Sequence, residues 1–97
     1  MPMPADHELL AIAMEHEQAG RVAEAERIYR QLLAKHPGNA DLIHAVGLMA
    51  YRSGRAEEAR HWIEQAIAID SGQAIYCNNL GTILQSLEQY APAAACL

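Results

Sequence analysis

The sequence predicts an all-α solenoid, built from antiparallel helix pairs that repeat every 34 residues. Three observations support this fold class. A shift of 34 residues superimposes apolar and small residues along most of the chain. Within each unit the apolar residues have the spacing of a helix face. Glycine, proline and asparagine separate the helical segments, which is where helices end and begin.

The 34-residue register aligns residues of the same kind at the positions that pack helices together. The aligned sets are Leu9, Ile43 and Cys77; Ile12, Val46 and Leu80; Ala13, Gly47 and Gly81; Ala25, Ala59 and Ala93; and Tyr29, Ile63 and Leu97. The small residues of the third and fourth sets allow two helix backbones to approach closely. We therefore predict that each unit is a tightly packed helical hairpin.

Each helix is predicted from its apolar spacing and from the residues at its ends. In the first helix, one face with i, i+3, i+4, i+7 spacing consists of Leu9, Ile12, Ala13 and His16. Gly20 and Gly54 suit the left-handed turn that ends the first helix of a unit, and Asn39 can cap the next unit. The predicted helices span 6–19, 22–35, 40–53, 56–69 and 74–87, with the start of another from about residue 90.

These residues resemble the tetratricopeptide repeat. The matching segments are Leu9-x-x-Ile12-Ala13 with Ala25-x-x-x-Tyr29 and Pro37, then Ile43-x-x-Val46-Gly47 with Ala59-x-x-x-Ile63, then Cys77-x-x-Leu80-Gly81 with Ala93. The resemblance implies one domain over 1–97, a right-handed solenoid of about two and two-thirds repeats at 6–39, 40–73 and 74–97. The sequence departs from the family pattern at Ser71, where the family usually has Pro. The second helix of the third repeat is less regular, because Glu88 replaces the turn Gly and Pro92 falls inside the last helix.

The third repeat also predicts a longer protein and an exposed apolar surface at the C-terminal end. The register calls for about ten more helical residues after Leu97, so we expect the chain to be a piece of a longer one. With only a short segment to cover them, four side chains are expected to be exposed: Leu80, Ile83, Leu84 and Leu87. Their burial between two copies predicts a homo-oligomer that forms through the C-terminal end.

The family resemblance also places a concave peptide groove on the first helices. Its predicted residues are Leu10, Met14, Glu17, His44, Leu48, Arg52, Asn78, Asn79, Thr82 and Gln85. Such a mixed strip suits a protein or peptide partner. The Asn and Gln side chains can bind the backbone of the partner, and Met and Leu can contact the side chains of the partner. Met14 and Leu48 equally fit ordinary packing, and Arg52 fits a pair with a nearby acid. Family members that bind the C-termini of chaperones use several Lys, Arg and Asn side chains in one groove. Only Arg52 and Asn78 could take this part here, so chaperone binding is disfavoured.

A second resemblance leads to an alternative function. Asn78-Asn79-Leu80-Gly81 is similar to a motif in the N-terminal repeats of O-linked N-acetylglucosamine transferases and their bacterial relatives. It implies that Asn79 contacts a substrate backbone, and that the chain is the substrate-recruiting arm of a glycosyltransferase whose catalytic domain is absent here. Ala11 and Ala45 occupy the positions of the first two repeats that match Asn79, so the asparagine does not recur from repeat to repeat. A third alternative is a purely structural array with an empty groove.

Composition argues against several other classes. The net charge is −5 and the basic residues are scattered, which disfavours nucleic acid as a partner. No apolar run is long enough to cross a membrane and the start lacks the features of a signal peptide, so we expect a cytoplasmic protein. Cys77 and Cys96 are then expected to be reduced thiols.

Catalytic and cofactor signatures are missing from the sequence. The five histidines form no close-spaced pair of metal ligands; they are His7, His16, His36, His44 and His61. There is no glycine-rich phosphate loop and no nucleophile elbow. We therefore predict a non-catalytic protein-binding scaffold, with no metal and no cofactor.

Overall fold

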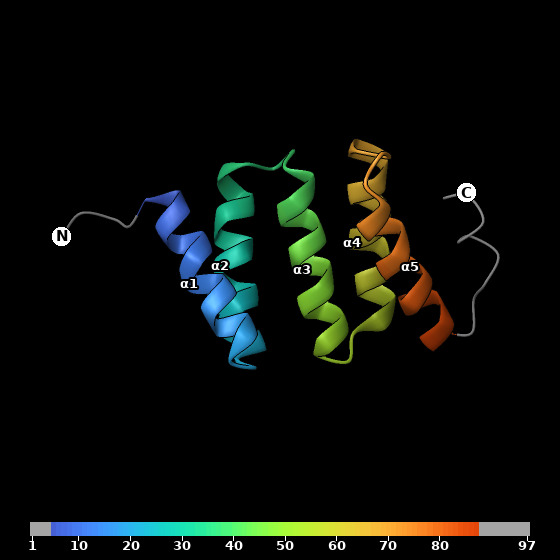
Figure 1. The fold of residues 1–97 in the computed structure, drawn as a ribbon, viewed down its shortest axis with the longest axis horizontal. Helices are drawn as coiled ribbons and strands as arrows, with labels where there is room; N and C mark the ends of the chain where they lie inside the picture. Colours follow the sequence, from blue (N-terminus) through green and yellow to red (C-terminus); the bar gives the residue numbers. More distant parts are fainter. Residues whose placement is uncertain (1–4, 88–97) are drawn as a thin grey trace.

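The computed structural model describes residues 5–87, which form five α-helices and no strand (Figure 1). The helices are α1 (Asp6–Gln18), α2 (Val22–Lys35), α3 (Ala40–Arg52), α4 (Ala56–Ile69) and α5 (Ala74–Ser86). Their bounds agree with the predicted ones to within one residue. The helix predicted from about residue 90, with Pro92, Ala93 and Leu97, lies outside the described residues.

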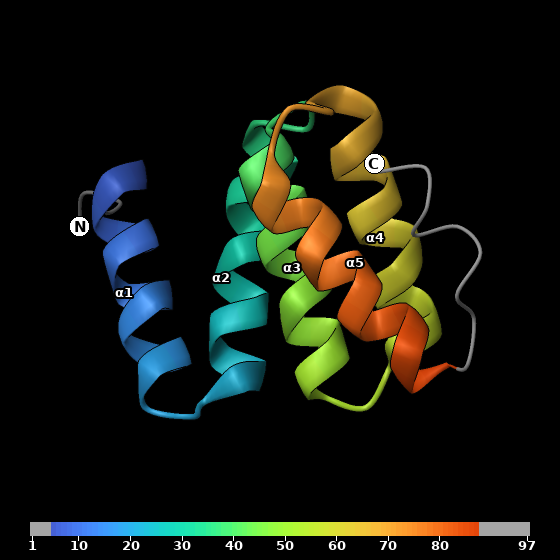
Figure 2. The same cartoon turned by 45° about the vertical axis from the view of Figure 1, so that its right-hand side comes forward.

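The helices stack as an all-α solenoid, as predicted. α1 packs against α2 and α3 against α4, and each pair is connected through α2 with α3 and through α4 with α5. Figure 1 shows the helices following one another along the long axis of the molecule, and Figure 2 shows α5 lying beside both α3 and α4. We call α1, α3 and α5 the first-helix layer, and α2 and α4 the second-helix layer.

The turns within the two hairpins have the same geometry. Gly20 and Gly54 have φ values of 82° and 85°, the left-handed conformation that was predicted for them. After each glycine the next amide closes the helix end, because Arg21 N donates to His16 O at 2.8 Å and Arg55 N donates to Ala50 O at 2.9 Å. Between the hairpins, Asn39 Oδ1 accepts from Leu42 N at 3.1 Å, which confirms the predicted cap.

The core consists of two clusters related by the 34-residue register. The N-terminal core contains Leu9, Ala13, Ala25, Tyr29, Leu32, Leu42, Val46 and Met49. The C-terminal core contains Ile43, Ala50, Ala59, Ile63, Ala66, Tyr76, Leu80, Ile83 and Leu84. Each core lies between one hairpin and the first helix of the next hairpin. Consequently each first helix has one face for its own hairpin and another for the hairpin before it.

On α1, the face that would pack against a preceding hairpin is polar. Val46 and Leu80 pack against the preceding hairpin, and the matching residue of α1 is Ile12. Ile12 is 38% exposed, so the prediction that it packs together with Leu9 and Ala13 is wrong. The reason is that no hairpin precedes α1 in the described part of the chain, and Glu8 and Glu15 flank Ile12 on this face.

The prediction that α5 exposes its aliphatic side chains is also wrong. Leu80, Ile83 and Leu84 are at most 3% exposed, and Leu87 is half-buried. These side chains point into the C-terminal core, because α5 packs against α4 and touches α3 with its apolar face. Self-association through four exposed aliphatic residues therefore loses its physical basis.

Candidate functional site

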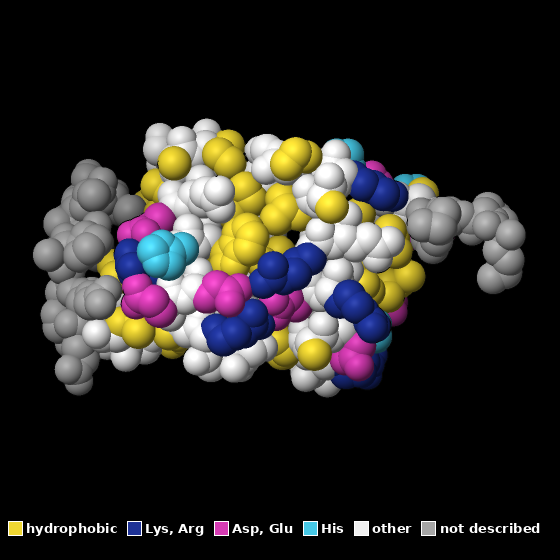
Figure 3. Space-filling model, turned by 180° about the vertical axis from the view of Figure 1, so that it is seen from behind, with side chains coloured by type: hydrophobic (Ala, Val, Ile, Leu, Met, Phe, Trp, Pro, Cys, Tyr) yellow, Lys and Arg dark blue, Asp and Glu magenta, His cyan; other side chains and the backbone are white. Residues whose placement is uncertain are grey.

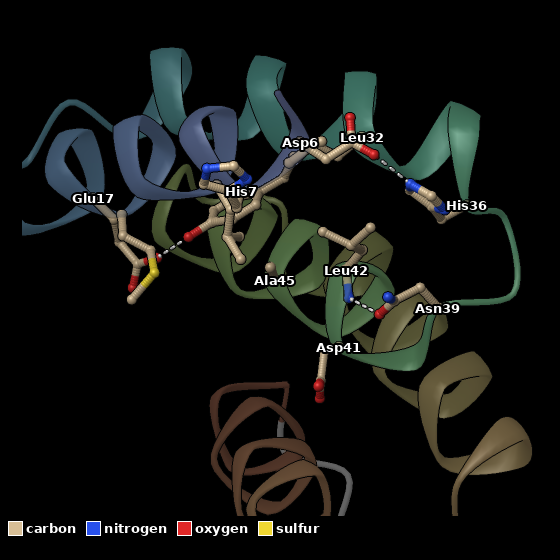
Figure 4. Close-up of a pocket in the computed structure, with 12 residues that line it drawn as sticks. Asp6, His7, Glu17, Leu32, His36, Asn39, Asp41, Leu42 and Ala45 are labelled. Atoms are coloured by element: carbon tan, nitrogen blue, oxygen red, sulfur yellow. Dashed lines mark hydrogen bonds and ion pairs between the residues drawn. The ribbon is translucent and has the colours of Figure 1, made fainter. Parts of the chain in front are cut away.

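A pocket of about 410 Å³ lies between α1 and α3 (Figure 4). It exists because α1 and α3 do not pack against each other, whereas the next pair of first helices, α3 and α5, do. Its lining residues are Asp6, His7, Leu10, Met14, Glu17, Tyr29, Leu32, His36, Asn39, Asp41, Leu42 and Ala45. A volume of this size can hold one or two large side chains of a partner.

The interior of the pocket is apolar and open to solvent. Leu32 and Leu42 are buried members of the N-terminal core and provide its base. Leu10 and Met14 on α1 line one side and remain 39% and 48% exposed. Two exposed apolar side chains over a buried apolar base are typical of a surface that gains stability when another apolar group covers it.

Carboxylates and their partners surround this apolar interior. At one end Tyr29 donates its hydroxyl hydrogen to Glu17 at 2.8 Å, and Arg52 approaches Glu17 at 3.6 Å. At the other end Asp6 pairs with His36 at 2.7 Å (Figure 4). Asp6 also pairs with Lys35 at 3.2 Å. The hydrogen bonds from His36 and Lys35 lower the pKa of Asp6, so this carboxylate is ionised at neutral pH.

A polar contact joins α3 to α5 beside the pocket. Asp41 accepts a hydrogen bond from the Tyr76 hydroxyl, and the rings of His44 and Tyr76 are 4.6 Å apart between centroids. The Asn79 amide nitrogen lies 2.8 Å from His44 Nε2. Because the amide group donates, the neutral His44 ring accepts through Nε2. This contact holds the two helices together at the position where α1 and α3 are separated.

The structure brings three of the ten predicted groove residues together in the pocket: Leu10, Met14 and Glu17. The others lie outside it. His44 is 8% exposed and Leu48 is half-buried against the N-terminal core, which fits the packing interpretation for Leu48. Arg52 pairs with Glu17, as its alternative interpretation expected.

The α5 residues form a separate polar strip. Asn78, Thr82 and Gln85 are exposed, and the Thr82 hydroxyl donates to Asn78 O at 3.2 Å within the helix. Asn79 is half-buried and its amide is held by His44. The strip therefore offers exposed amide and hydroxyl groups from Asn78, Thr82 and Gln85.

Sequence reasoning missed most of the remaining pocket residues, although a signal for two of them exists. His7 precedes Leu10 by three residues and Met14 by seven, so it belongs to the same face of α1. Asp41 has the same register position in α3. By contrast, Tyr29 and Leu32 come from the second helix, and only the separation of α1 from α3 uncovers them.

The His44 contact predicts a pH-dependent stability. Burial lowers the pKa of His44, while the neighbouring Asp41 and Glu17 carboxylates oppose this shift. The folded protein then binds a proton less readily than the unfolded chain, whose His pKa is about 6.5. Stability is thus expected to be full above about pH 6.5 and to decrease as the pH falls through the lower pKa of the folded state.

We expect a smaller decrease in the His44→Gln variant, which does not titrate in this range. The measurement is urea unfolding followed by circular dichroism at about pH 7.5 and pH 5.5. An equal loss of stability in both proteins would show that other groups cause it.

Several other features of the described residues bear on function. Residues 5–87 contain no group of three His, Cys, Asp or Glu side chains able to hold a metal ion. Among their helices, none combines the length and the apolar character needed to span a bilayer. Cys77 is a half-buried free thiol, and Cys96 lies outside the described residues.

Comparison with solved structures shows where this fold occurs. The translocator chaperone SycD of Yersinia enterocolitica superimposes with a TM-score of 0.85 at 15% identity, over 94% of this chain and 68% of SycD. SycD in complex with a peptide of the translocator YopD gives a TM-score of 0.86 at 16% identity, over 96% and 72%. At these identities the similarity concerns the fold alone.

Sequence relatives cover only small parts of much longer proteins. The cell division cycle protein 16 homolog of Mus musculus is 28% identical over 95 residues, which is 88% of this chain and 15% of that protein. Cellulose synthase operon protein C of Komagataeibacter xylinus is 36% identical over 69 residues, 69% of this chain and 5% of that protein. The chain therefore spans less than a sixth of these relatives.

The family model that matches describes the tetratricopeptide repeat, and it covers residues 10–74. This span contains most of α1, all of α2, α3 and α4, and the first residue of α5. It includes the aligned small residues of the first two repeats, Ala13, Gly47, Ala25 and Ala59, together with both left-handed turns. The chain belongs to the tetratricopeptide repeat family.

Proposed function

We propose that this chain is a non-catalytic module that binds a peptide segment of a partner protein on its first-helix layer. The observation that carries the proposal is the apolar pocket between α1 and α3, in which Leu10 and Met14 stay exposed beside a buried base. Apolar anchors in such a pocket contribute most of the affinity in peptide recognition, and polar neighbours fix the orientation.

A bound segment would continue from the pocket along the first-helix layer towards α5. Beyond the pocket it would meet Arg52 and the exposed Asn78, Thr82 and Gln85, whose side chains can pair with backbone amides and carbonyls. Three of the predicted groove residues take a supporting role in this proposal. His44 and Asn79 hold α3 against α5, and Leu48 supports the floor.

The peptide complex of SycD supports this proposal by analogy of fold. A helical solenoid of the same shape accommodates a peptide in that structure. The analogy concerns the mode of binding, since the identity of 16% carries no information about the partner. A homo-oligomer has weaker support, because α5 buries the residues that predicted it.

The glycosyltransferase arm stays a prediction, as does the cytoplasmic location. Of the motif that suggested the arm, Asn79 is the residue expected to contact a substrate backbone. In this chain its amide is already bonded to His44. This contact favours the general peptide-binding module over the substrate-recruiting arm.

The test is a selection of binders from a random dodecapeptide display library, followed by affinity measurements with Met14→Gln. This variant removes an apolar wall of the pocket without a change in charge. We expect its affinity for selected peptides to fall about ten-fold, from the lost burial of one apolar side chain. Because Met14 is 48% exposed, stability should change little.

Ile69→Gln is the matched control. Ile69 is 50% exposed at the end of α4 and does not line the pocket. Its replacement should leave the affinity unchanged. If no peptide is selected, or if both variants bind the selected peptides equally, the proposed site is wrong.

A further inference from the structure

The charges of this protein are divided unequally between its two layers. Six of the seven Lys and Arg residues lie on α2, α4 or the residues that cap their first turns: Arg21, Arg27, Arg30, Lys35, Arg55 and Arg60. The first-helix layer contains one cation, Arg52, and five carboxylates: Asp6, Glu8, Glu15, Glu17 and Asp41. Nearly all of the negative excess therefore belongs to the layer that carries the pocket.

Charges of the second-helix layer largely neutralise one another. Arg30 pairs with Glu26 and Glu58, and Arg55 pairs with the same two carboxylates. Figure 3, viewed from behind, shows Lys and Arg side chains next to Asp and Glu side chains on this face. Paired charges of opposite sign cancel beyond a Debye length of about 8–10 Å. This layer has little net field to attract a charged partner.

The pocket, in contrast, has an unbalanced border. Three of its lining residues are carboxylates, Asp6, Glu17 and Asp41, and none is Lys or Arg. Asp6 is the best neutralised, because Lys35 pairs with it and His36 lies within hydrogen-bond distance of it. Arg52, at 3.6 Å, is the cation that approaches Glu17. The two ends of α1 and the start of α3 thus place negative charge around an apolar interior.

The negative charges of Glu17 and Asp41 are only partly matched by the residues around them: Arg52 reaches Oε2 of Glu17 at 3.6 Å, and a tyrosine hydroxyl contacts one oxygen of each carboxylate. Tyr29 donates to Oε1 of Glu17 and Tyr76 donates to Oδ1 of Asp41. In the described part of the chain, Oδ2 of Asp41 makes no hydrogen bond or ion pair. Tyrosine hydroxyls stay protonated, because burial and the carboxylates raise the pKa of both. A hydroxyl satisfies one oxygen of each carboxylate without removing its charge.

We propose that the partner is a cationic segment, in which Lys or Arg residues flank the bulky apolar side chain that fills the pocket. This inference rests on the proposed function and adds the charge of the ligand to it. An apolar side chain would cover Leu10 and Met14, while flanking cations would meet Glu17 and Asp41. Complementary charges around an apolar centre speed association and exclude acidic competitors.

The experiment uses the peptides selected from the random library and the intact chain. One selected dodecapeptide is synthesised in three versions, with Lys, Gln or Glu at the positions next to its apolar anchor. Fluorescence anisotropy at about 25 and 150 mM salt gives the affinities. We expect Lys to bind better than Gln by about two- to five-fold per cation, Glu to bind worst, and the differences to shrink at higher salt.

Two isosteric variants locate the effect on the protein. Glu17→Gln and Asp41→Asn keep an oxygen that can accept from Tyr29 or Tyr76, and they remove one charge each. Both should weaken binding of the Lys peptide by a larger factor than binding of the Gln peptide, so that the preference for Lys over Gln shrinks. Glu64→Gln, on α4 and outside the pocket, is the control and should change neither.

The possible outcomes separate this inference from the proposed function. If Met14→Gln abolishes binding but the Lys, Gln and Glu peptides bind equally, the pocket is correct and its charge selectivity is wrong. A preference for the Glu peptide would also overturn the inference. If no peptide binds through the pocket, the proposed function fails first.

Discussion

Replacing Gly47 by Leu is expected to lower the free energy of unfolding by about 3 kcal/mol or more. Gly47 lies where α3 and α4 cross. A Cβ atom at this position would be 2.8 Å from Ile63 Cδ1 and 2.9 Å from Trp62 Cβ. Trp62 Cβ is fixed to the backbone of α4 and Ile63 is fully buried, so neither can turn away. The helices would have to separate, and the C-terminal core would lose contacts.

Gly81→Leu is the control, because Gly81 has the same position in the next repeat. No described atom lies within 4 Å of a Cβ built there, although the register predicted a close approach. The segment that the register would bring close to Gly81, from about residue 90, lies outside the described residues. Here Leu should leave stability unchanged or raise it by up to about 1 kcal/mol, since glycine disfavours helix. Urea unfolding followed by circular dichroism measures both variants. Equal stability of Gly47→Leu and the unsubstituted chain would contradict the close packing of this hairpin.

Local signals explain why the helix bounds could be predicted so closely. Gly20 and Gly54 adopt the left-handed conformation that ends a helix, and Asn39 caps the next one. Each of these signals depends on a few neighbouring residues. Burial, however, depends on which hairpin lies beside a face. For this reason Ile12 was wrongly placed in the core and Leu84 wrongly placed at the surface.

The site was less predictable than the fold for a related reason. The family register identified Leu10, Met14 and Glu17, which share a face of α1 with helical spacing. The pocket itself arises because α1 and α3 do not pack against each other, which no residue pattern reports. That separation uncovers Tyr29 and Leu32 of α2. Periodicity therefore predicts which face of a helix can bind a partner. Only the packing of neighbouring hairpins shows where that face forms a pocket.

A charged network on the second-helix layer connects the two hairpins. Glu26 of α2 is only 8% exposed and accepts from Arg30 Nε at 2.9 Å and from Arg55 at the start of α4. Arg30 also reaches Glu58 of α4 at 2.8 Å and lies over the Trp62 ring, 5.3 Å from its centroid. Trp62 Nε1 in turn donates to Glu58 at 3.0 Å. A buried carboxylate with two guanidinium partners is stable only while both partners are present.

We expect Arg55→Met to lower the free energy of unfolding by about 1–3 kcal/mol, because it leaves Glu26 buried with one cation. Arg60→Met is the matched control. Arg60 pairs with Glu57 and Glu64 on its own helix, and ion pairs within one helix contribute about 0.5 kcal/mol or less. If both variants lose the same stability in urea, the network does not join the hairpins.

The same network predicts a dependence on pH. Burial alone would raise the pKa of Glu26, but the hydrogen bonds from Arg55 and Arg30 outweigh it and hold the pKa below its ordinary value of 4.5. The unfolded chain then binds a proton at a higher pH than the folded protein does. The stabilisation from Glu26 is present above about pH 4.5 and is lost as the pH falls through the lower folded pKa. In Glu26→Gln this part of the acid sensitivity should be absent, and Arg55→Met should add little further destabilisation to it, because the two changes remove the same contact. Additive losses in that double-mutant cycle would mean that Glu26 and Arg55 act independently.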